Sequence, residues 1–162
     1  MARHKEPPAG PEQVAAIAQG YAFDGPALDF GALVADGTAR PDVQVRIPLA
    51  MINRHGLVAG ATGTGKTKTL QLMAEQLSAL GVPVFAADIK GDLSGIATAG
   101  EPTDRTLARA SEIGQNWTAL ACPAEFYALG GQGQGVPLRV TITSFGPTLL
   151  SKVLGLNGVQ ES

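Results

Sequence analysis

The chain has 162 residues, and its 12 lysines and arginines against 14 aspartates and glutamates give a formal net charge of −2. With 44% hydrophobic and 16% charged residues, the composition excludes an intrinsically disordered protein and favours one ordinary globular domain or part of a larger one. The cations are scattered and form no basic stripe, so composition gives no case for electrostatic binding of nucleic acid.

Two further features bear on the cellular location. Cys122 is the only cysteine and cannot form an internal disulfide, which favours a buried or half-buried thiol in a reducing compartment. The N-terminal residues lack the apolar segment of a secretory signal, and no run approaches the eighteen or so apolar residues of a membrane span. We therefore expect a cytoplasmic protein without a membrane-spanning segment.

The first part of the chain predicts little regular structure. Residues 1–12 have the charges and prolines of a loose tail, and residues 14–18 predict a short helix that ends by Gly20. Glycines and prolines interrupt residues 21–41, whereas residues 43–48 alternate between apolar and polar and predict a strand. We therefore predict a tail and turn-rich segment over residues 1–40 and a larger domain over residues 41–162, with a small β-containing segment before the main part of the fold.

The middle of the chain predicts a βαβ unit. Residues 56–59 and 82–87 are short apolar runs of the kind found in strands buried on both faces. Between them, residues 66–80 predict a helix with an apolar stripe at i, i+3, i+4, i+7 and i+10, ended by Gly81. Such a unit predicts an α/β fold whose two strands lie parallel in one sheet, flanked by helices.

The later elements are less regular. Residues 102–113 predict a second helix, residues 138–143 a strand, and residues from Gly146 onward a last helix. Residues 130–135 are glycine-rich and no helix follows them, so a solvated loop is favoured over a second phosphate-binding loop.

The strongest functional signal lies between the first predicted βαβ strand and its helix. It reads Gly60-Ala-Thr-Gly-Thr-Gly-Lys66-Thr67 and matches the phosphate-binding pattern G-x-x-x-x-G-K-[ST] in full. The partial positive charge at a helix N-terminus favours an anion at this place in the fold. A plain glycine-rich turn that ends in an exposed lysine is the alternative, and the strand–loop–helix context argues against it.

Each position of the motif has a physical role. The three glycines permit backbone geometry that other residues avoid and let the main chain approach the phosphates. Lys66 supplies positive charge to the β- and γ-phosphates, and the Thr67 hydroxyl is expected to ligate Mg²⁺. The amides from Thr62 to Lys68 form an anion nest, although the Lys68 side chain itself is best explained by the helix start. The predicted nucleotide-binding residues are Gly60, Thr62, Gly63, Thr64, Gly65, Lys66, Thr67 and Lys68.

Hydrolysis needs more than this loop. An ATPase usually carries a strand that ends in Asp, often followed by a Glu that polarises the attacking water. The run at residues 84–87 ends in Asp88, but Ile89 follows, and no apolar run between residues 89 and 162 ends in Asp-Glu. Asp88 is either a water-mediated Mg²⁺ ligand or a cap of the Lys90-Gly91 turn, and the sequence does not separate the two. No catalytic residue is assigned.

Other sites have weaker support. Asp88 to Gly91 formally match a GTPase motif, but the 22 positions after Lys66 leave no room for a switch segment, and a guanine-reading motif is absent. His4 and His55 have no carboxylate or cysteine pattern around them. The four aspartates before residue 43 lie in predicted turns, where Asp bonds to the backbone.

A family resemblance now becomes visible. The stretch Ile47-Pro-Leu-Ala-Met-Ile-Asn-Arg-His-Gly-Leu-Val-Ala-Gly-Ala-Thr-Gly-Thr-Gly-Lys-Thr, together with Val82-Pro-Val-Phe-Ala-Ala-Asp-Ile-Lys-Gly-Asp-Leu-Ser-Gly95, closely resembles bacterial helicase HerA-like domain proteins. These belong to the HerA/FtsK group of P-loop motor ATPases. The segment from Ser144 to Gln160 resembles the family as well, so the likeness covers most of residues 43–162.

The resemblance implies ATP and Mg²⁺ as ligands, a RecA-like core with a mainly parallel sheet, and hexameric rings that move DNA. Family members are longer than this chain, and their Asp-Glu strand and the arginine that acts on a neighbour's ATP lie beyond the position that matches Ser162. We therefore expect the N-terminal part of such a domain, with an incomplete sheet and an exposed apolar edge.

Three functional hypotheses follow. The first is an ATPase that works as part of a HerA-like motor. The second is a module that binds nucleotide without hydrolysing it. The third is a small P-loop kinase; such enzymes usually carry an arginine-rich lid, and here Arg105 and Arg109 form the only close pair, which a solvated helix face explains better.

Overall fold

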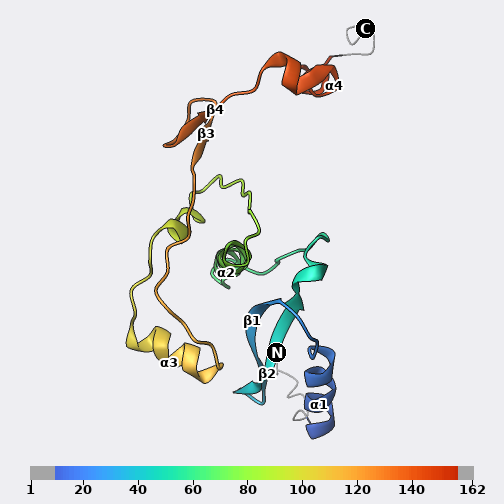
Figure 1. Ribbon diagram of the computed structural model, residues 1–162, viewed down its shortest axis with the longest axis vertical. Helices are drawn as coiled ribbons and strands as arrows, with labels where there is room; N and C mark the ends of the chain where they lie inside the picture. Colours follow the sequence, from blue (N-terminus) through green and yellow to red (C-terminus); the bar gives the residue numbers. More distant parts are fainter. Residues whose placement is uncertain (1–9, 157–162) are drawn as a thin grey trace, which may run out of the picture. The chain divides into compact units, whose positions relative to one another are not determined.

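The computed structural model describes residues 10–156, which form two compact units separated between Cys122 and Pro123 (Figure 1). Most of the predicted tail at residues 1–12 lies outside the described residues. The described residues form helices and small sheets, so the predicted α/β class is confirmed in this coarse sense. The predicted domain boundary at residues 40 and 41 falls inside a strand, and the two compact units divide much later in the chain.

A β-hairpin organises the first unit. Strands β1 (Ala27–Ala35) and β2 (Thr38–Pro48) pair antiparallel through a two-residue turn. Asp36 and Gly37 have φ angles of 52° and 78°, which a type I′ turn requires and which an Asp-Gly pair adopts readily. The predicted strand at residues 43–48 is thus confirmed, but it begins earlier. Its partner β1 was missed.

Three helices accompany the hairpin. Helix α1 (Pro11–Gly20) packs against β2, and α2 (Lys66–Ala79) packs against β1. Helix α3 (Asp104–Glu112) begins at Thr103, whose hydroxyl accepts the Thr106 amide, and its end is tied to β2 where Gln44 donates to the Ile113 carbonyl at 3.0 Å. All three helices were predicted, and their bounds differ from the predictions by only a few residues at each end.

The core of the first unit is small. Leu28 is fully buried, and the other buried apolar side chains come from the hairpin, α2, α3 and the end of the unit. They are Ala35, Ala39, Val43, Leu77, Ala110 and Cys122. Burial of Cys122 agrees with the prediction for this thiol. Of the predicted apolar stripe of α2, only Leu77 is buried, and Leu70 and Leu80 remain 42% and 43% exposed.

The predicted βαβ unit is not formed by the described residues. Neither residues 56–59 nor residues 82–87 belong to a strand, and Leu57 and Phe85 are 89% and 85% exposed. A parallel strand is stable only between partner strands and under covering layers, and an apolar run that lacks them stays extended and exposed. The prediction of two parallel strands flanking α2 is therefore wrong for this structure. Two one-turn helices, η1 (Leu49–Met51) and η2 (Ser94–Ala97), lie in the connecting segments.

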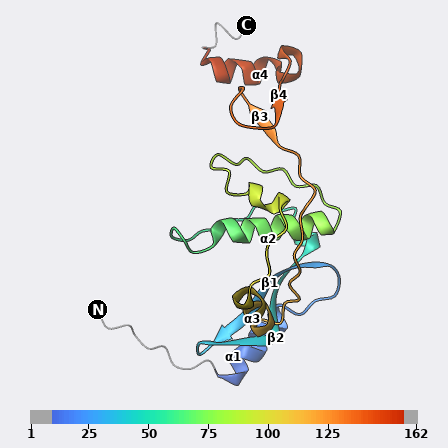
Figure 2. The same cartoon turned by 90° about the vertical axis from the view of Figure 1, so that its left-hand side faces the viewer.

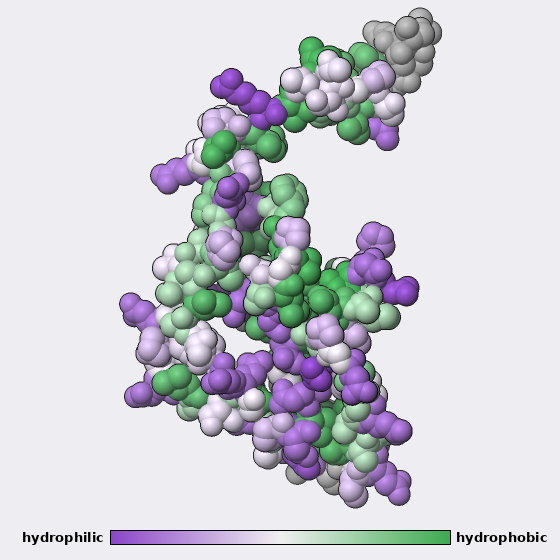
Figure 3. All heavy atoms as spheres, viewed as in Figure 1, coloured by the Kyte–Doolittle hydropathy of each residue, from purple (hydrophilic) through white to green (hydrophobic). Residues whose placement is uncertain are grey.

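The second unit contains two short strands and one helix. Strands β3 (Tyr127–Leu129) and β4 (Val136–Leu138) pair parallel, joined by the exposed glycine-rich residues 130–135, as predicted for a solvated loop. The predicted strand at residues 138–143 is wrong, because Thr141 caps helix α4 (Ile142–Leu154) by accepting the Ser144 amide. Gly146 leaves helical geometry with φ 73°, so α4 is kinked at this residue, and the predicted last helix corresponds to the part of α4 after the kink. Ile142 and Val153 of α4 are 75% and 71% exposed, and hydrophobic residues are visible on the surface in a space-filling view (Figure 3).

Candidate nucleotide-binding site

The glycine-rich loop leads directly into helix α2, as the motif predicts. Gly63 and Gly65 have φ angles of 80° and 97°, in the left-handed region that a side chain disfavours. Gly65 is the N-cap of α2, and the helix begins at Lys66. Because glycine has no capping side chain, the amides of the first helical turn are left available at the positive end of the helix dipole.

One carbonyl group organises the loop. The Ala61 carbonyl oxygen accepts the Thr64 hydroxyl at 2.8 Å and the Lys66 ammonium group at 2.8 Å, and the Thr64 amide lies 3.4 Å from it. These hydrogen bonds close residues 61–66 into a tight turn and hold the Lys66 amine against the backbone of the loop. An ammonium group held this way is free to exchange a neutral carbonyl for a charged phosphate oxygen, which is the stronger acceptor.

Gly60 serves a different purpose from the other two glycines. A Cβ atom placed on Gly60 would lie 2.6 Å from the Thr64 hydroxyl oxygen and 3.7 Å from Cγ of Lys66. The backbone of Gly60 is not in the left-handed region, so the position demands space and not an unusual φ angle. The prediction that all three glycines are needed for backbone geometry is corrected at this residue.

The remaining motif residues lie where the helix start places them. Thr62 and Thr64 are exposed at the loop, and Thr67 is half-buried in the first turn of α2. The Lys68 amine donates to the Gln71 side chain at 2.9 Å, along the helix. This agrees with the expectation that the Lys68 side chain belongs to the helix surface, and only its amide remains a candidate ligand.

Asp88 caps a turn. Its two carboxylate oxygens accept the Gly91 amide at 2.9 Å and the Leu93 amide at 2.8 Å. These bonds, with that from Leu93 the largest contribution, hold the pKa of Asp88 below its ordinary value of 3.8, so the carboxylate is ionised at neutral pH. The capping interpretation is therefore observed, and the ionised oxygens retain the character of a hard ligand for Mg²⁺.

The other polar residues of interest lie outside residues 60–67 of the sequence. Arg54 and His55 are exposed, and Arg109 pairs with Glu112 at 2.7 Å on the exposed face of α3, as expected for a solvated face. His4 lies outside the described residues. Residues 10–156 hold no group of three His, Cys, Asp or Glu side chains that suits a metal ion.

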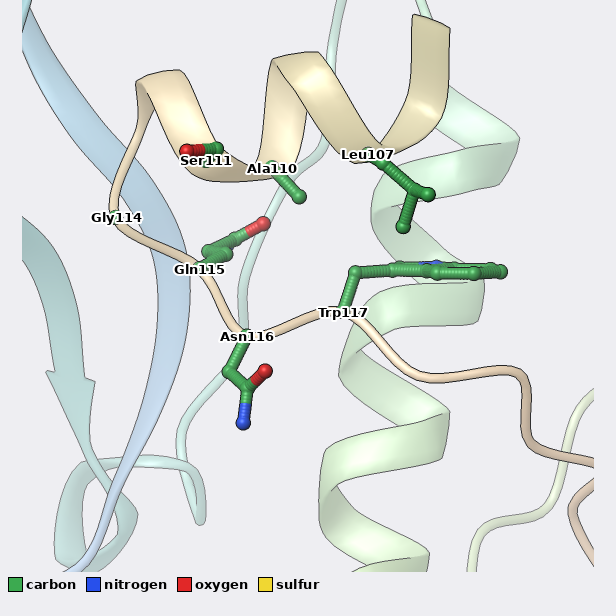
Figure 4. A pocket seen from close by; sticks show the side chains of 7 residues that line it. All are labelled: Leu107, Ala110, Ser111, Gly114, Gln115, Asn116 and Trp117. Atoms are coloured by element: carbon green, nitrogen blue, oxygen red, sulfur yellow. The ribbon is translucent and has the colours of Figure 1, made fainter. Parts of the chain in front are cut away.

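One pocket of the first unit lies away from the glycine-rich loop. It has a volume of about 420 Å³ and lies between α3 and the chain that follows it, with the Trp117 indole beside Leu107 (Figure 4). Its lining residues are Leu107, Ala110, Ser111, Gly114, Gln115, Asn116 and Trp117, none of which belongs to the motif. A phosphate loop binds through main-chain amides and needs no deep cavity of its own, so we place the candidate site at the loop.

Comparison with models of protein families shows to which family the chain is related. The model of the family described as helicase HerA-like C-terminal matches residues 34–162. The chain belongs to this family. The match begins in β1 and includes both the glycine-rich loop and the Asp88 turn. It therefore confirms the resemblance to HerA-like proteins that the sequence around the loop and the turn indicates. Searches of curated proteins and of solved structures found no match. In the part of the chain that the structure describes, no helix combines the length and apolar character needed to cross a membrane.

Two contributors to this site were not predicted from sequence. The Thr64 hydroxyl was assigned only as part of a loop of amides, although it shares the Ala61 carbonyl with Lys66. Gln71 was not considered, although its amide joins α2 to the Asp92 carbonyl. The one available signal for Gln71 is its spacing, since it lies four residues after Thr67 and so one helical turn along the same face.

Proposed function

We propose that this HerA-like chain binds a Mg²⁺–nucleoside triphosphate, ATP in the family, through residues 60–67. The observation that carries the proposal is the arrangement around the Ala61 carbonyl, where Lys66 is held over a loop of left-handed glycines at an uncapped helix N-terminus. Positive charge, open amides and close backbone approach converge there, and these are the features that bind a polyphosphate.

The donor set also fits Mg²⁺. The Thr67 hydroxyl lies in the first turn of α2, and the ionised Asp88 carboxylate provides a second hard oxygen group. We propose Thr67 as a direct ligand and Asp88 as a ligand through water. The bound ion would neutralise charge on the β- and γ-phosphates.

Family membership supports a wider role. We propose that this sequence contributes the nucleotide-binding portion of a RecA-like ATPase that assembles as a ring and moves DNA. The proposal does not include ATP hydrolysis by this chain alone, because no apolar run after residue 89 ends in the Asp-Glu pair that activates water. We therefore favour nucleotide binding without hydrolysis for these 162 residues on their own.

Titration with a fluorescent ATP analogue in the presence of Mg²⁺ tests the binding site. Lys66→Ala removes a charge-assisted bond to phosphate, which is worth about 1.5–3 kcal/mol, so we expect an affinity about tenfold or more below that of the unchanged chain. Lys152→Ala is the matched control, because it removes an exposed lysine in the last turn of α4 and should leave the affinity unchanged. Equal affinities for Lys66→Ala and the unchanged chain would contradict the proposal.

A phosphate-release assay with and without DNA separates binding from catalysis. We expect no turnover by the 162-residue chain in either condition. DNA-stimulated release would show that the chain hydrolyses ATP after all, and transfer of phosphate to a metabolite would favour the kinase hypothesis instead.

A further inference from the structure

A glutamine on helix α2, the helix that follows the glycine-rich loop, joins that helix to the Asp88 turn. The Gln71 amide nitrogen donates to the Asp92 carbonyl at 3.0 Å, and its oxygen accepts the Lys68 amine at 2.9 Å. Both ends of the side chain are therefore engaged, and η2, which follows the turn, lies beside α2 (Figure 2). Among the described side chains of α2, Gln71 alone makes a hydrogen bond to the segment at residues 88–95.

The segment that Gln71 holds is built around one carboxylate. Asp88 accepts the amides of Gly91 and Leu93, and the Ser94 hydroxyl donates to the Gly91 carbonyl at 2.7 Å. Asp92 lies between the two amides that Asp88 binds, so a bond to its carbonyl fixes the whole turn. When Gln71 holds Asp92, it also holds the backbone that orients the Asp88 carboxylate.

Helix geometry places this connection next to the phosphate loop. Gln71 follows Thr67 by four residues, so the two side chains lie on one face of α2, one turn apart. The Asp88 turn is therefore tied to the same helical face that presents the Thr67 hydroxyl. The Asp88 carboxylate, proposed above as a water-mediated ligand of Mg²⁺, is thus connected through Gln71 to the helix that carries the proposed direct ligand Thr67.

We infer that Gln71 is a positioning residue, which couples the Asp88 turn to Mg²⁺–nucleotide binding at residues 60–67. The inference rests on the proposed function and extends it to a residue outside the motif. Coupling of two segments is reciprocal, so bound Mg²⁺–nucleotide stabilises the turn by the same factor by which the ordered turn raises the affinity.

Two measurements on Gln71→Met test the coupling, since methionine has a similar length and cannot form the two hydrogen bonds. The first is the ratio of affinities for the fluorescent ATP analogue with Mg²⁺ and with a chelator. Loss of one bond of typical strength predicts a fall of about fivefold in this ratio. The second is amide hydrogen exchange at Gly91 and Leu93, which Mg²⁺–nucleotide should slow in the unchanged chain but not in Gln71→Met.

Gln76→Met is the matched control on the same helix. Like Gln71, Gln76 makes two side-chain hydrogen bonds, in this case both to another segment. Its amide nitrogen donates to the Asp29 carbonyl at 2.8 Å, and its oxygen accepts the Asp29 amide at 2.7 Å. Gln76→Met should lower the stability of the folded chain without changing how the nucleotide affinity depends on Mg²⁺. A merely structural role for Gln71 would make the two variants behave alike.

The possible outcomes separate the inference from the function on which it rests. Failure of the unchanged chain to bind nucleotide would overturn both. A second outcome would overturn the coupling alone. In it, nucleotide binding depends on Lys66, but Gln71→Met has the same ratio of affinities with Mg²⁺ and with chelator, and the same amide hydrogen exchange at Gly91 and Leu93, as the unchanged chain. If Gln71→Met does not fold, Gln71→Asn provides the same test, because its amide is one methylene too short to span to Asp92.

Discussion

Substitution of Gly60 by alanine tests the construction of the phosphate loop most specifically. The new Cβ would lie 2.6 Å from the Thr64 hydroxyl oxygen, closer than side-chain atoms approach one another, so that hydroxyl must leave the Ala61 carbonyl. Loss of this 2.8 Å bond costs about 1 kcal/mol, which corresponds to about fivefold in nucleotide affinity. The Ala61 carbonyl would then keep only the Lys66 amine as a side-chain donor, and the Lys66 amine must give up this bond in order to bind phosphate.

The chain offers two controls for this effect. A Cβ on Gly56 meets no atom within 4 Å, and the Gly56 backbone is not left-handed, so Gly56→Ala should leave the affinity within about twofold of the unchanged chain. In a Thr64→Ala background the clash with the hydroxyl is absent. There, Gly60→Ala should have little further effect, so the two substitutions should be strongly non-additive.

Titration of the four proteins in this double-mutant cycle with the fluorescent ATP analogue gives the coupling energy directly. Urea unfolding followed by the single tryptophan, Trp117, checks that each protein is folded during the titration. Wild-type affinity in Gly60→Ala would refute the reasoning. An equal penalty for Gly60→Ala in both backgrounds would show that the Thr64 hydroxyl is not the group displaced.

Two further predictions concern titratable groups. The amides of Leu93 and Gly91 lower the pKa of Asp88 in the folded chain, so its contribution to stability is complete above pH 3.8 and is lost as the pH falls through the lowered value. Nuclear magnetic resonance should show the Asp88 carboxyl and the two amides titrating together below 3.8, and a midpoint at or above that value would contradict the turn. Burial raises the pKa of the Cys122 thiol above its usual 9.0, so an aromatic disulfide reagent at about pH 8 should react about tenfold or more slowly with the folded chain than with the urea-unfolded chain. Equal rates would show that the thiol is accessible.

The helices could be predicted from sequence because their signals are local. The stripe of α2 follows the helical period, and the glycines before Lys66 mark its start. Thr103 and Gly114 mark the two ends of α3 in the same way, through a side-chain cap and a left-handed glycine.

The strands could not be predicted in this way, because a strand depends on a partner elsewhere in the chain. The apolar runs at residues 56–59 and 82–87 have the composition of buried strands, but among residues 10–156 no strand pairs with either. Conversely, β1 was hidden among glycines and prolines. Its one clear signal, the Asp36-Gly37 turn, was counted only as an interruption.

In the candidate site, too, local features could be predicted from sequence and contacts between distant segments could not. The order of Gly60, Lys66 and Thr67 along the chain is enough to place the loop at the start of α2. The sequence left two roles open for Asp88, and only its bonds to Gly91 and Leu93 show that it caps a turn. Gln71 resembles any polar residue on a helix surface until its contact with a segment twenty-one residues later is seen.

The central claim is that residues 60–67 bind the phosphates of a nucleotide, and competition against the bound fluorescent ATP analogue tests it most directly. A phosphate loop contacts phosphates and not the base. We predict that pyrophosphate with Mg²⁺ displaces the analogue, whereas adenosine at the same concentration does not. Displacement by adenosine with no effect of pyrophosphate would place the bound analogue elsewhere on the chain and would contradict the account.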